Sequence, residues 1–186
     1  IKQGNYLIIS NHSSWLDIII LGSTFKTTFL SKIEVSKWPV IGKITTAVDM
    51  LFINRGEKNA ASLAVSGISE FLSRNRNVAI FPEGTSSGGK KLLSFKPRLF
   101  ASCIDSGCPV QCVVIKYPYK NKNIHPSVPL VRGNSLFLNI LKVLFHKDIT
   151  AEITITKLIE TKGKDRKSIS NECYQTVKNI LESNVN

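Results

Sequence analysis

Short apolar runs rich in β-branched residues alternate along this chain with segments whose apolar residues recur every three or four positions. The short runs predict strands, and the periodic segments predict amphipathic helices. Several runs are apolar at nearly every position, as parallel strands buried on both faces are. The predicted strands are residues 6–10, 28–31, 50–53, 78–81, 110–116 and 150–155. This alternation predicts an α/β domain with helices packed on a largely parallel sheet.

Two segments keep the helical period clearly, and each should lay one apolar face on the sheet. The first lies within 59–75 and carries Ala61, Ala64, Val65, Ile68, Phe71 and Leu72. The second carries Ile169, Cys173, Val177, Ile180 and Leu181. The stretch 117–133 has three prolines and, with His125 counted, four basic residues, so we expect a long surface loop there, of a length that is often functional.

The segment 136–145 is apolar around most of its circumference. Its polar residues Asn139 and Lys142 continue with His146 as one narrow stripe. Such a helix is either buried or faces lipid. We expect burial, because core helices are commoner and no Trp or Lys-rich flank marks an interface.

The length of 186 residues and the 42% hydrophobic content fit one domain over 1–186 and exclude disorder, and no internal repeat is seen. The sequence begins at Ile1 without Met, and one interpretation is that an upstream anchor or signal segment has been removed. No apolar run approaches the ~18 residues that cross a bilayer. The four cysteines form no CxxC pair, so we expect reduced structural thiols and no metal site.

The charge balance is strongly positive, with 25 Lys and Arg against 13 Asp and Glu, a net charge of +12. Such an excess indicates an anionic partner: a phospholipid surface, a phosphorylated substrate or nucleic acid. The sequence carries no recognisable nucleic-acid motif or aromatic stacking pattern, so we expect no nucleic-acid partner. A non-enzymatic basic module that binds anionic membranes remains a competing hypothesis.

The first candidate site follows the strand at 6–10 and precedes an apolar helix. His12 would lie at the carboxyl end of that strand, where ligands gather in open α/β sheets. Asp17 could fold back to one ring nitrogen and leave the other free to accept a proton. Ser14-x-x-Asp17 also has the form of a capping box, in which the acid serves backbone donors. Taken alone, the two interpretations are about equally good.

The second candidate site is the segment 81–89, which leaves a buried strand through Glu83 and Gly84. Its glycines and hydroxyls let backbone N–H groups approach an anion, and four basic residues follow at 90–98. An acid beside a buried strand is costly unless a neighbour uses it. A flexible loop with solvated lysines is the alternative.

The same segment matches G-x-S-x-G, which raises a serine esterase with Ser86 as nucleophile. That elbow requires a helix directly after the serine, whereas here a helix is plausible only from Pro97 onward. The acid and base would come from Asp105 or Asp148 with His125 or His146, none in a persuasive context. We therefore favour this alternative least among enzymes.

A third candidate is Arg55, which follows the strand at 50–53 and would reach the same sheet edge. A guanidinium binds phosphate through paired hydrogen bonds that lysine cannot offer. In isolation, however, an arginine after a strand is more often an ordinary solvated side chain.

Taken in order, the blocks Asn11-His12-x4-Asp17, Phe52-Ile53-Asn54-Arg55 and Phe81-Pro82-Glu83-Gly84-Thr85 and the run 109–116 resemble the glycerolipid acyltransferase family. That family includes 1-acylglycerol-3-phosphate acyltransferase. The likeness spans about residues 6–118. The HxxxxD and FPEGT blocks are specific together, and the other two are weak singly.

The resemblance implies transfer of a fatty acyl group from acyl-CoA or acyl carrier protein to a lysophospholipid hydroxyl. It assigns His12 as general base and Asp17 as its orienting partner. It associates Arg55, Glu83 and Gly84 with the acceptor's phosphate, and Thr85 belongs to that block by position. It also implies a mixed sheet, association with an anionic membrane surface on the cytoplasmic face, and no metal or bound cofactor.

Two positions depart from the family pattern. Ser86 stands where arginine is frequent, and Asn54 stands where aspartate is frequent. Fewer cationic groups near the headgroup weaken the case for 1-acylglycerol-3-phosphate as acceptor. Another lysolipid, including lyso-ornithine lipid, therefore remains an alternative.

Overall fold

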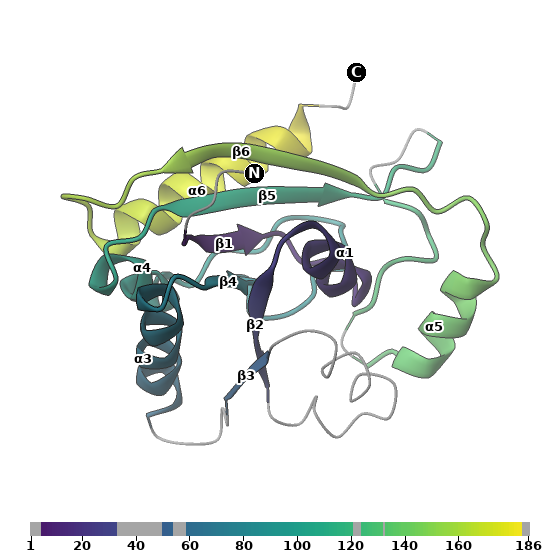
Figure 1. Cartoon of the computed structure of the whole chain (residues 1–186). Coiled ribbons are helices and arrows are strands. Elements are labelled where there is room, and N and C mark those ends of the chain that lie inside the picture. Colours follow the sequence, from purple (N-terminus) through teal and green to yellow (C-terminus); the bar gives the residue numbers. More distant parts are fainter. Residues whose placement is uncertain (1–4, 33–49, 54–58, 121–123, 132, 184–186) are drawn as a thin grey trace.

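The computed structural model describes residues 5–32, 50–53, 59–120, 124–131 and 133–183 (Figure 1). Within them lies a six-stranded sheet in the order β3-β2-β4-β1-β5-β6. The strands are β1 (Leu7–Ser10), β2 (Thr27–Lys32), β3 (Met50–Ile53), β4 (Asn77–Ile80), β5 (Val110–Lys116) and β6 (Glu152–Ile159). Neighbouring strands are parallel except β5 and β6, which are antiparallel. The predicted α/β fold with a mixed, largely parallel sheet is confirmed.

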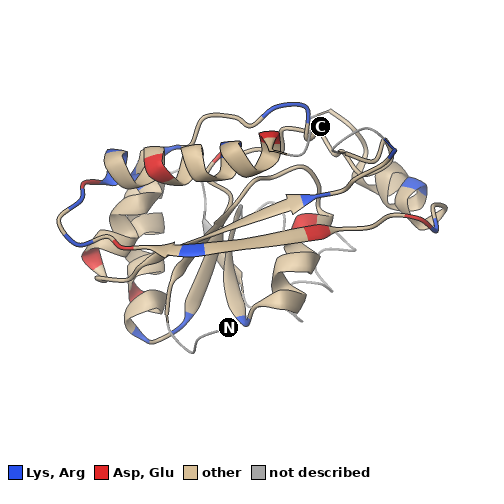
Figure 2. Ribbon diagram, turned by 90° about the horizontal axis from the view of Figure 1, so that it is seen from above, with Lys and Arg blue, Asp and Glu red and all other residues tan. Residues whose placement is uncertain are grey.

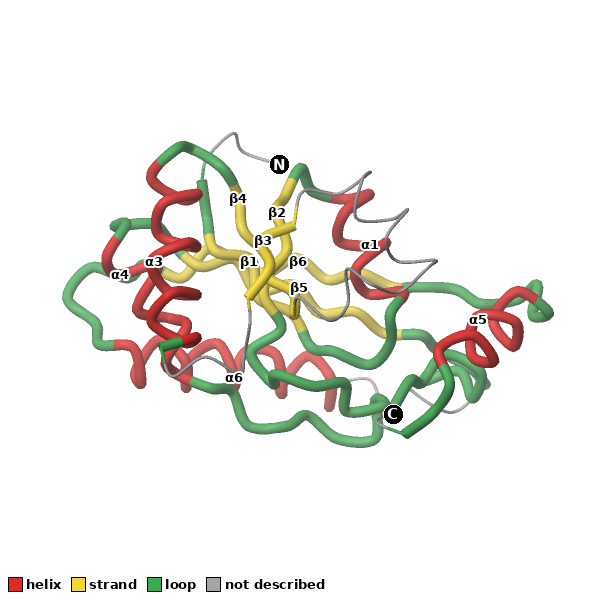
Figure 3. Tube along the Cα trace, turned by 90° about the horizontal axis from the view of Figure 1, so that it is seen from below, coloured by secondary structure: helices red, strands yellow, loops and turns green. Residues whose placement is uncertain are grey.

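Helices cover both faces of the sheet (Figure 3). The helical elements are α1 (Leu16–Thr24), α3 (Ala60–Ser73), the short 3₁₀ helix η2 (Pro97–Phe100), α4 (Ala101–Asp105), α5 (Leu136–Leu144) and α6 (Arg166–Glu182). One apolar layer joins α3, α4 and α6 to the sheet, and a second joins α1 to the opposite face. In β1, Leu7 and Ile9 face the first layer and Ile8 faces the second, which explains why this strand is apolar throughout.

The last strand is longer and lies further along the chain than the predicted 150–155. Strand β6 runs over Glu152–Ile159 because its pairing with β5 continues from Lys116 opposite Glu152 to Val110 opposite Ile159. Most of its side chains are exposed, so polar residues are tolerated between apolar ones. A half-exposed edge strand of this kind carries a weak apolar signal.

The segment 117–133 is not a simple surface loop, contrary to the prediction. Tyr117, His125, Ser127 and Val128 are buried in the part of this segment that the structure describes. Tyr117 and Val128 complete the apolar layer on the α1 side of the sheet. The prolines exclude regular structure, but the chain still packs into the core.

The prediction that residues 136–145 form a buried helix is wrong in its burial. The helix α5 is present, but Phe137, Leu138, Leu144 and Phe145 are 63%, 65%, 71% and 84% exposed. Only Asn139 and Val143 are buried on α5. Of the polar stripe, Asn139 faces the protein and donates to backbone carbonyls there, as described below, whereas Lys142 and His146 are exposed.

The four cysteines, all of them buried, form no disulfide. Free thiols in apolar surroundings agree with the predicted structural role. Across the described ranges, none of the helices combines the length and apolarity that crossing a bilayer demands.

Candidate active site

Three neighbouring strands end at the same edge of the sheet and bring the candidate segments together. Strand β1 lies between β4 and β5, and the three are parallel. The chain leaves β1 through Asn11 and His12, leaves β4 toward Glu83, and leaves β5 through Tyr117. Ligands bind at such an edge where connections from one strand diverge to both sides.

Asn11 extends the sheet by one step beyond β1. Its side-chain nitrogen donates to the carbonyl of Ile115, and its side-chain oxygen accepts the N–H of Ile115, both at 2.9 Å. The amide therefore mimics a backbone pairing with β5 and is itself buried. This fixes the direction in which the next residue, His12, leaves the sheet.

His12 and Asp17 lie within hydrogen-bond distance of one another. The Nδ1 of His12 is 2.9 Å from Oδ2 of Asp17. A proton on Nδ1 donated to this carboxylate leaves a lone pair on Nε2. The imidazole stacks on Phe81 with ring centroids 4.1 Å apart, and its side chain is 18% exposed while that of Asp17 is fully buried. The buried carboxylate of Asp17 thus orients the imidazole of His12, which is a partly accessible base.

Asp17 serves the helix terminus and the histidine with one carboxylate. Its Oδ2 also accepts the backbone N–H groups of Ser13 at 2.7 Å and Ser14 at 2.9 Å. Its Oδ1 accepts the hydroxyl of Tyr117 at 2.6 Å. The capping and dyad interpretations are therefore compatible, since these donors satisfy a carboxylate that burial alone would destabilise.

Tyr117 is a positioning residue that the sequence did not reveal. Burial and the nearby charge of Asp17 raise the pKa of this phenol well above its ordinary value, so it remains a proton donor. The only sequence signal is a tyrosine directly after the strand at 110–116. Its partner becomes visible only when β5 is known to lie beside β1.

Removing the Tyr117 hydroxyl should weaken the orientation of the dyad. We expect Tyr117→Phe to lower kcat of the acyl transfer that the sequence predicts by about tenfold, with little change in KM. We also expect the free energy of unfolding to fall by about 1–3 kcal/mol, because Oδ1 of Asp17 loses its hydrogen-bond donor. Steady-state kinetics and urea unfolding measure the two effects. Tyr119→Phe, in the same segment, is the matched control. A loss of stability with unchanged kcat would reduce Tyr117 to a structural role.

Glu83 ties the loop after β1 to the loop after β4. Its Oε1 accepts the backbone N–H of His12 at 2.7 Å, and its Oε2 accepts that of Leu93 at 2.9 Å. The side chain is buried, and burial raises the pKa of this carboxyl above its ordinary value although both hydrogen bonds oppose the shift. Both carboxylate oxygens accept backbone N–H groups. Glu83 therefore positions the loop that carries His12, whether or not it also contacts substrate.

The glycine-rich loop lies against the backbone of His12. The N–H of Ser87 and its hydroxyl both donate to the His12 carbonyl, at 2.8 and 3.0 Å. Gly84 has φ +74°, and a Cβ there would lie 2.7 Å from Nζ of Lys96. Glycine thus permits both the turn and the close approach of a cation. Thr85 is exposed beside it.

Arg55 lies outside the described residues. Strand β3, which precedes it in the chain, is separated from β4 by β2. The carboxyl end of β3 nevertheless points to the same edge as β4 and β1, because all three strands are parallel through β2.

Ser86 does not occupy a nucleophile elbow. The chain continues without helix from Ser86 until η2 begins at Pro97, whereas an elbow requires a helix at once. The Ser86 hydroxyl accepts the N–H of Gly88, a contact within the loop. The structure thus removes the main support for the esterase alternative.

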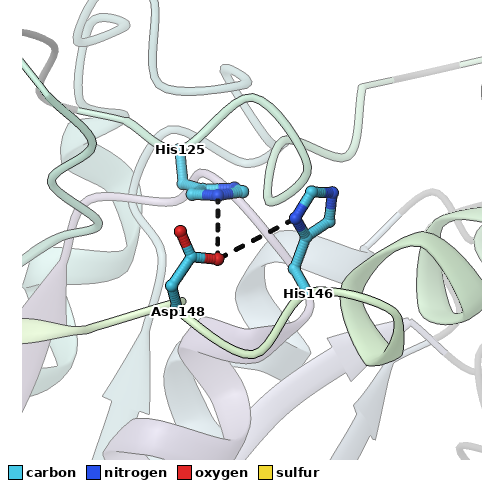
Figure 4. A group of neighbouring side chains, drawn as sticks. All are labelled: His125, His146 and Asp148. Atoms are coloured by element: carbon cyan, nitrogen blue, oxygen red, sulfur yellow. Dashed lines mark ion pairs between the residues drawn. The ribbon is translucent and has the colours of Figure 1, made fainter.

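A second group of titratable side chains lies where the segment after β5 passes the end of α5 (Figure 4). Oδ1 of Asp148 is 3.9 Å from Nε2 of His125 and 3.9 Å from Nδ1 of His146. Among the described residues, these are the ones that could share a metal ion. However, the N–H of Ser127 donates to Nδ1 of His125, which places the proton of the neutral ring on Nε2. That proton would have to leave before Nε2 could bind a metal; Nε2 is buried without a hydrogen-bond partner, and the 3.9 Å to Asp148 is longer than a hydrogen bond.

A cavity of about 400 Å³ lies at this edge of the sheet; its lining includes the chain neighbours of His12 but neither His12 nor Asp17. Asn11 and Ser13 line it on either side of His12 in the chain, and Tyr117 lines it from the end of β5. The opposite wall comes from the glycine-rich loop and α6. Lys90 and Lys91 contribute cations, Lys178 is paired with Glu182 at 4.0 Å, and Leu92, Ile124 and Leu181 contribute apolar surface. Such a lining suits a ligand with an anionic and an apolar part.

The chain is similar to known acyltransferases. A family model described as acyltransferase matches residues 1–116. The lyso-ornithine lipid O-acyltransferase of Pseudomonas aeruginosa is 34% identical over 175 residues, covering 94% of this chain and 67% of that protein. The 1-acyl-sn-glycerol-3-phosphate acyltransferase of Neisseria gonorrhoeae is 28% identical over 176 residues, covering 94% and 69%. The crystal structure of the 1-acyl-sn-glycerophosphate acyltransferase PlsC of Thermotoga maritima shares the fold, with TM-score 0.67, 24% identity and coverage of 98% and 67%.

Proposed function

The chain belongs to the acyltransferase family, and from this we propose that it transfers a fatty acyl group from acyl-CoA or acyl carrier protein to the hydroxyl of a lysophospholipid. The observation that carries the proposal is the contact between His12 and Asp17, 2.9 Å long, at the carboxyl end of the central strand. The family supplies the reaction class, and the dyad supplies a base of the kind that the reaction needs.

In the proposed mechanism Nε2 of His12 accepts the proton of the acceptor hydroxyl. The hydroxyl oxygen attacks the thioester carbonyl as that proton leaves, and the C–S bond then breaks. The thiolate takes the proton from the imidazolium, so ester and free thiol form and no acyl-enzyme is needed. Asp17 stabilises the imidazolium and keeps the ring in position. Holding donor and acceptor together supplies a large part of the rate.

The remaining substrate contacts are proposals of the same kind. Gly84 and Thr85 offer backbone and hydroxyl groups to an anionic headgroup, with Lys96 beside them. The cavity next to Ser13 has cations and apolar walls for an amphipathic substrate. We propose no resident metal or cofactor, only the acyl donor as co-substrate. We further propose that the enzyme works at an anionic membrane surface on the cytoplasmic face.

Two headgroups compete for the acceptor site. Similar proteins are named for 1-acyl-sn-glycerol-3-phosphate and for lyso-ornithine lipid. Asn54 and Ser86, which depart from the family pattern, reduce the expected charge around a phosphate. We favour 1-acylglycerol-3-phosphate as acceptor and keep lyso-ornithine lipid as the alternative. Purified protein assayed with each acceptor and either acyl-CoA or acyl carrier protein as donor, with thiol release as readout, separates them, and activity with no combination overturns the proposal.

Arg55 provides a sharper test of phosphate recognition. We expect Arg55→Ala to raise KM for 1-acylglycerol-3-phosphate by about 10-fold or more with little change in kcat, because a hydrogen bond to a charged group is worth about 1.5–3 kcal/mol. The KM for lyso-ornithine lipid, an aminolipid, should change less. Arg74→Ala, at an exposed position directly after α3, is the control. Equal effects on both acceptors would reassign Arg55 away from phosphate.

A further inference from the structure

Helix α5 exposes large apolar side chains and buries Asn139, the reverse of an ordinary surface helix. Asn139 donates from its amide nitrogen to the carbonyls of Ser127 and Pro129, at 3.2 and 3.1 Å. Lys142 donates to the carbonyl of Pro126 at 3.3 Å. Asn139 and Lys142 thus donate hydrogen bonds to backbone carbonyls of residues 126–129, which belong to no helix or strand. Its apolar side is consequently turned outward.

The outward side is a continuous apolar edge. We define it as Phe137, Leu138, Leu144 and Phe145, which are 63–84% exposed. Phe137 and Leu144 are seven residues apart, as are Leu138 and Phe145, so they repeat on one side of the helix. Figure 1 shows α5 standing away from the sheet, at the margin of the molecule. An edge of large aliphatic and aromatic groups held in water is unfavourable and marks an interaction surface.

The charges around this edge indicate what it binds. Lys142 on α5 and Lys147 after it are exposed, the acidic Asp148 follows them, and the chain as a whole carries a net charge of +12. Figure 2 shows basic positions on α5 and on the segments near it. An apolar helix edge beside exposed lysines is complementary to a bilayer that carries anionic headgroups.

We propose that α5 is an interfacial helix, which inserts the apolar edge into the boundary between headgroups and acyl chains of an anionic membrane. This proposal rests on the proposed function, since the acceptor is then a lipid of that membrane. It identifies α5 as the element that makes the contact.

The same helix is tied to the dyad loop. The indole N–H of Trp15 donates to the side-chain oxygen of Asn139 at 2.9 Å. Trp15 lies between His12 and Asp17 in the chain, directly before α1. Membrane-bound α5 therefore holds the segment that carries the catalytic pair, and the two are positioned together at the lipid surface.

Vesicle binding tests this proposal independently of catalysis. The protein carries His12→Ala throughout, and its cosedimentation with vesicles of phosphatidylglycerol and phosphatidylcholine is compared with that of Phe137→Ser/Phe145→Ser. We expect the double variant to bind ~tenfold or more weakly, because two aromatic anchors are lost. Leu63→Ser/Ile104→Ser, exposed on α3 and α4, is the matched control and should bind as before. Vesicles of phosphatidylcholine alone, or high salt, should weaken binding of the parent protein.

Two outcomes overturn the proposal. One is equal vesicle binding by parent and Phe137→Ser/Phe145→Ser, with circular dichroism showing both folded. The other is a dimer in sedimentation equilibrium that Phe137→Ser/Phe145→Ser dissociates, which would mean that a second copy covers the edge. The proposed function is tested separately, by turnover of a short-chain acceptor kept monomeric in solution. No turnover there removes the function and leaves the vesicle result unaffected.

Discussion

Replacing His12 by alanine should lower kcat for acyl transfer by about 10²–10⁴-fold, the range that a positioned general base contributes. The loss should fall on kcat more than on KM, because the proton is transferred only in the transition state. Release of CoA thiol from acyl-CoA, followed with a thiol reagent, measures the rate continuously. The four cysteines of the protein are buried, so they should react slowly and leave the background low.

The variant His146→Ala is the matched control for this experiment. His146 is a half-exposed histidine beside Asp148, and its ring nitrogen lies 3.9 Å from that carboxylate. It therefore tests whether loss of any acid–histidine contact affects turnover. Normal rates in His12→Ala would remove the proposed base. Inactivity of both variants would point to a general disturbance, which the unfolding curves would then reveal.

The sequence predicted the dyad because its two residues are local. His12 and Asp17 are five residues apart on the two sides of a helix start, so their contact depends on local backbone alone. Tyr117 is 100 residues from its partner Asp17, and their contact depends on β5 lying beside β1. Strand order is a property of the whole sheet, and a single sequence does not state it. The sequence alone therefore did not predict the hydrogen bond between Tyr117 and Asp17.

Helix α5 shows a different limit. Its periodicity correctly predicted a helix with one narrow polar stripe, but the stripe does not say which way it points. The direction is set by Ser127 and Pro129, whose carbonyls accept from Asn139. Proline-containing segments leave carbonyls without a ladder partner, and a nearby amide satisfies them. The choice between a buried and an exposed apolar side thus depended on hydrogen bonding elsewhere in the chain.

Glu83 is expected to show the largest effect on stability. Glu83→Ala leaves the N–H groups of His12 and Leu93 without acceptors, at about 1–3 kcal/mol each. Glu83→Gln retains one acceptor oxygen, so we expect about half of that loss. Urea unfolding measures both variants, and Glu70→Gln, on the exposed side of α3, is the control. Turnover should fall as well, because the loop that holds His12 is no longer tied to the loop after β4.

The difference in unfolding free energy between wild type and Glu83→Gln, measured against pH, reports the protonation state of the Glu83 carboxyl. Burial raises the pKa of Glu83, so the folded protein holds this proton more tightly than the unfolded chain does. The contribution of Glu83 to stability is therefore largest at low pH. It declines as pH rises from the unfolded value of about 4.3 through the raised folded pKa. The stability of wild type relative to Glu83→Gln should fall across that window and then level off. A difference that instead grows with pH there would show that the backbone hydrogen bonds outweigh burial.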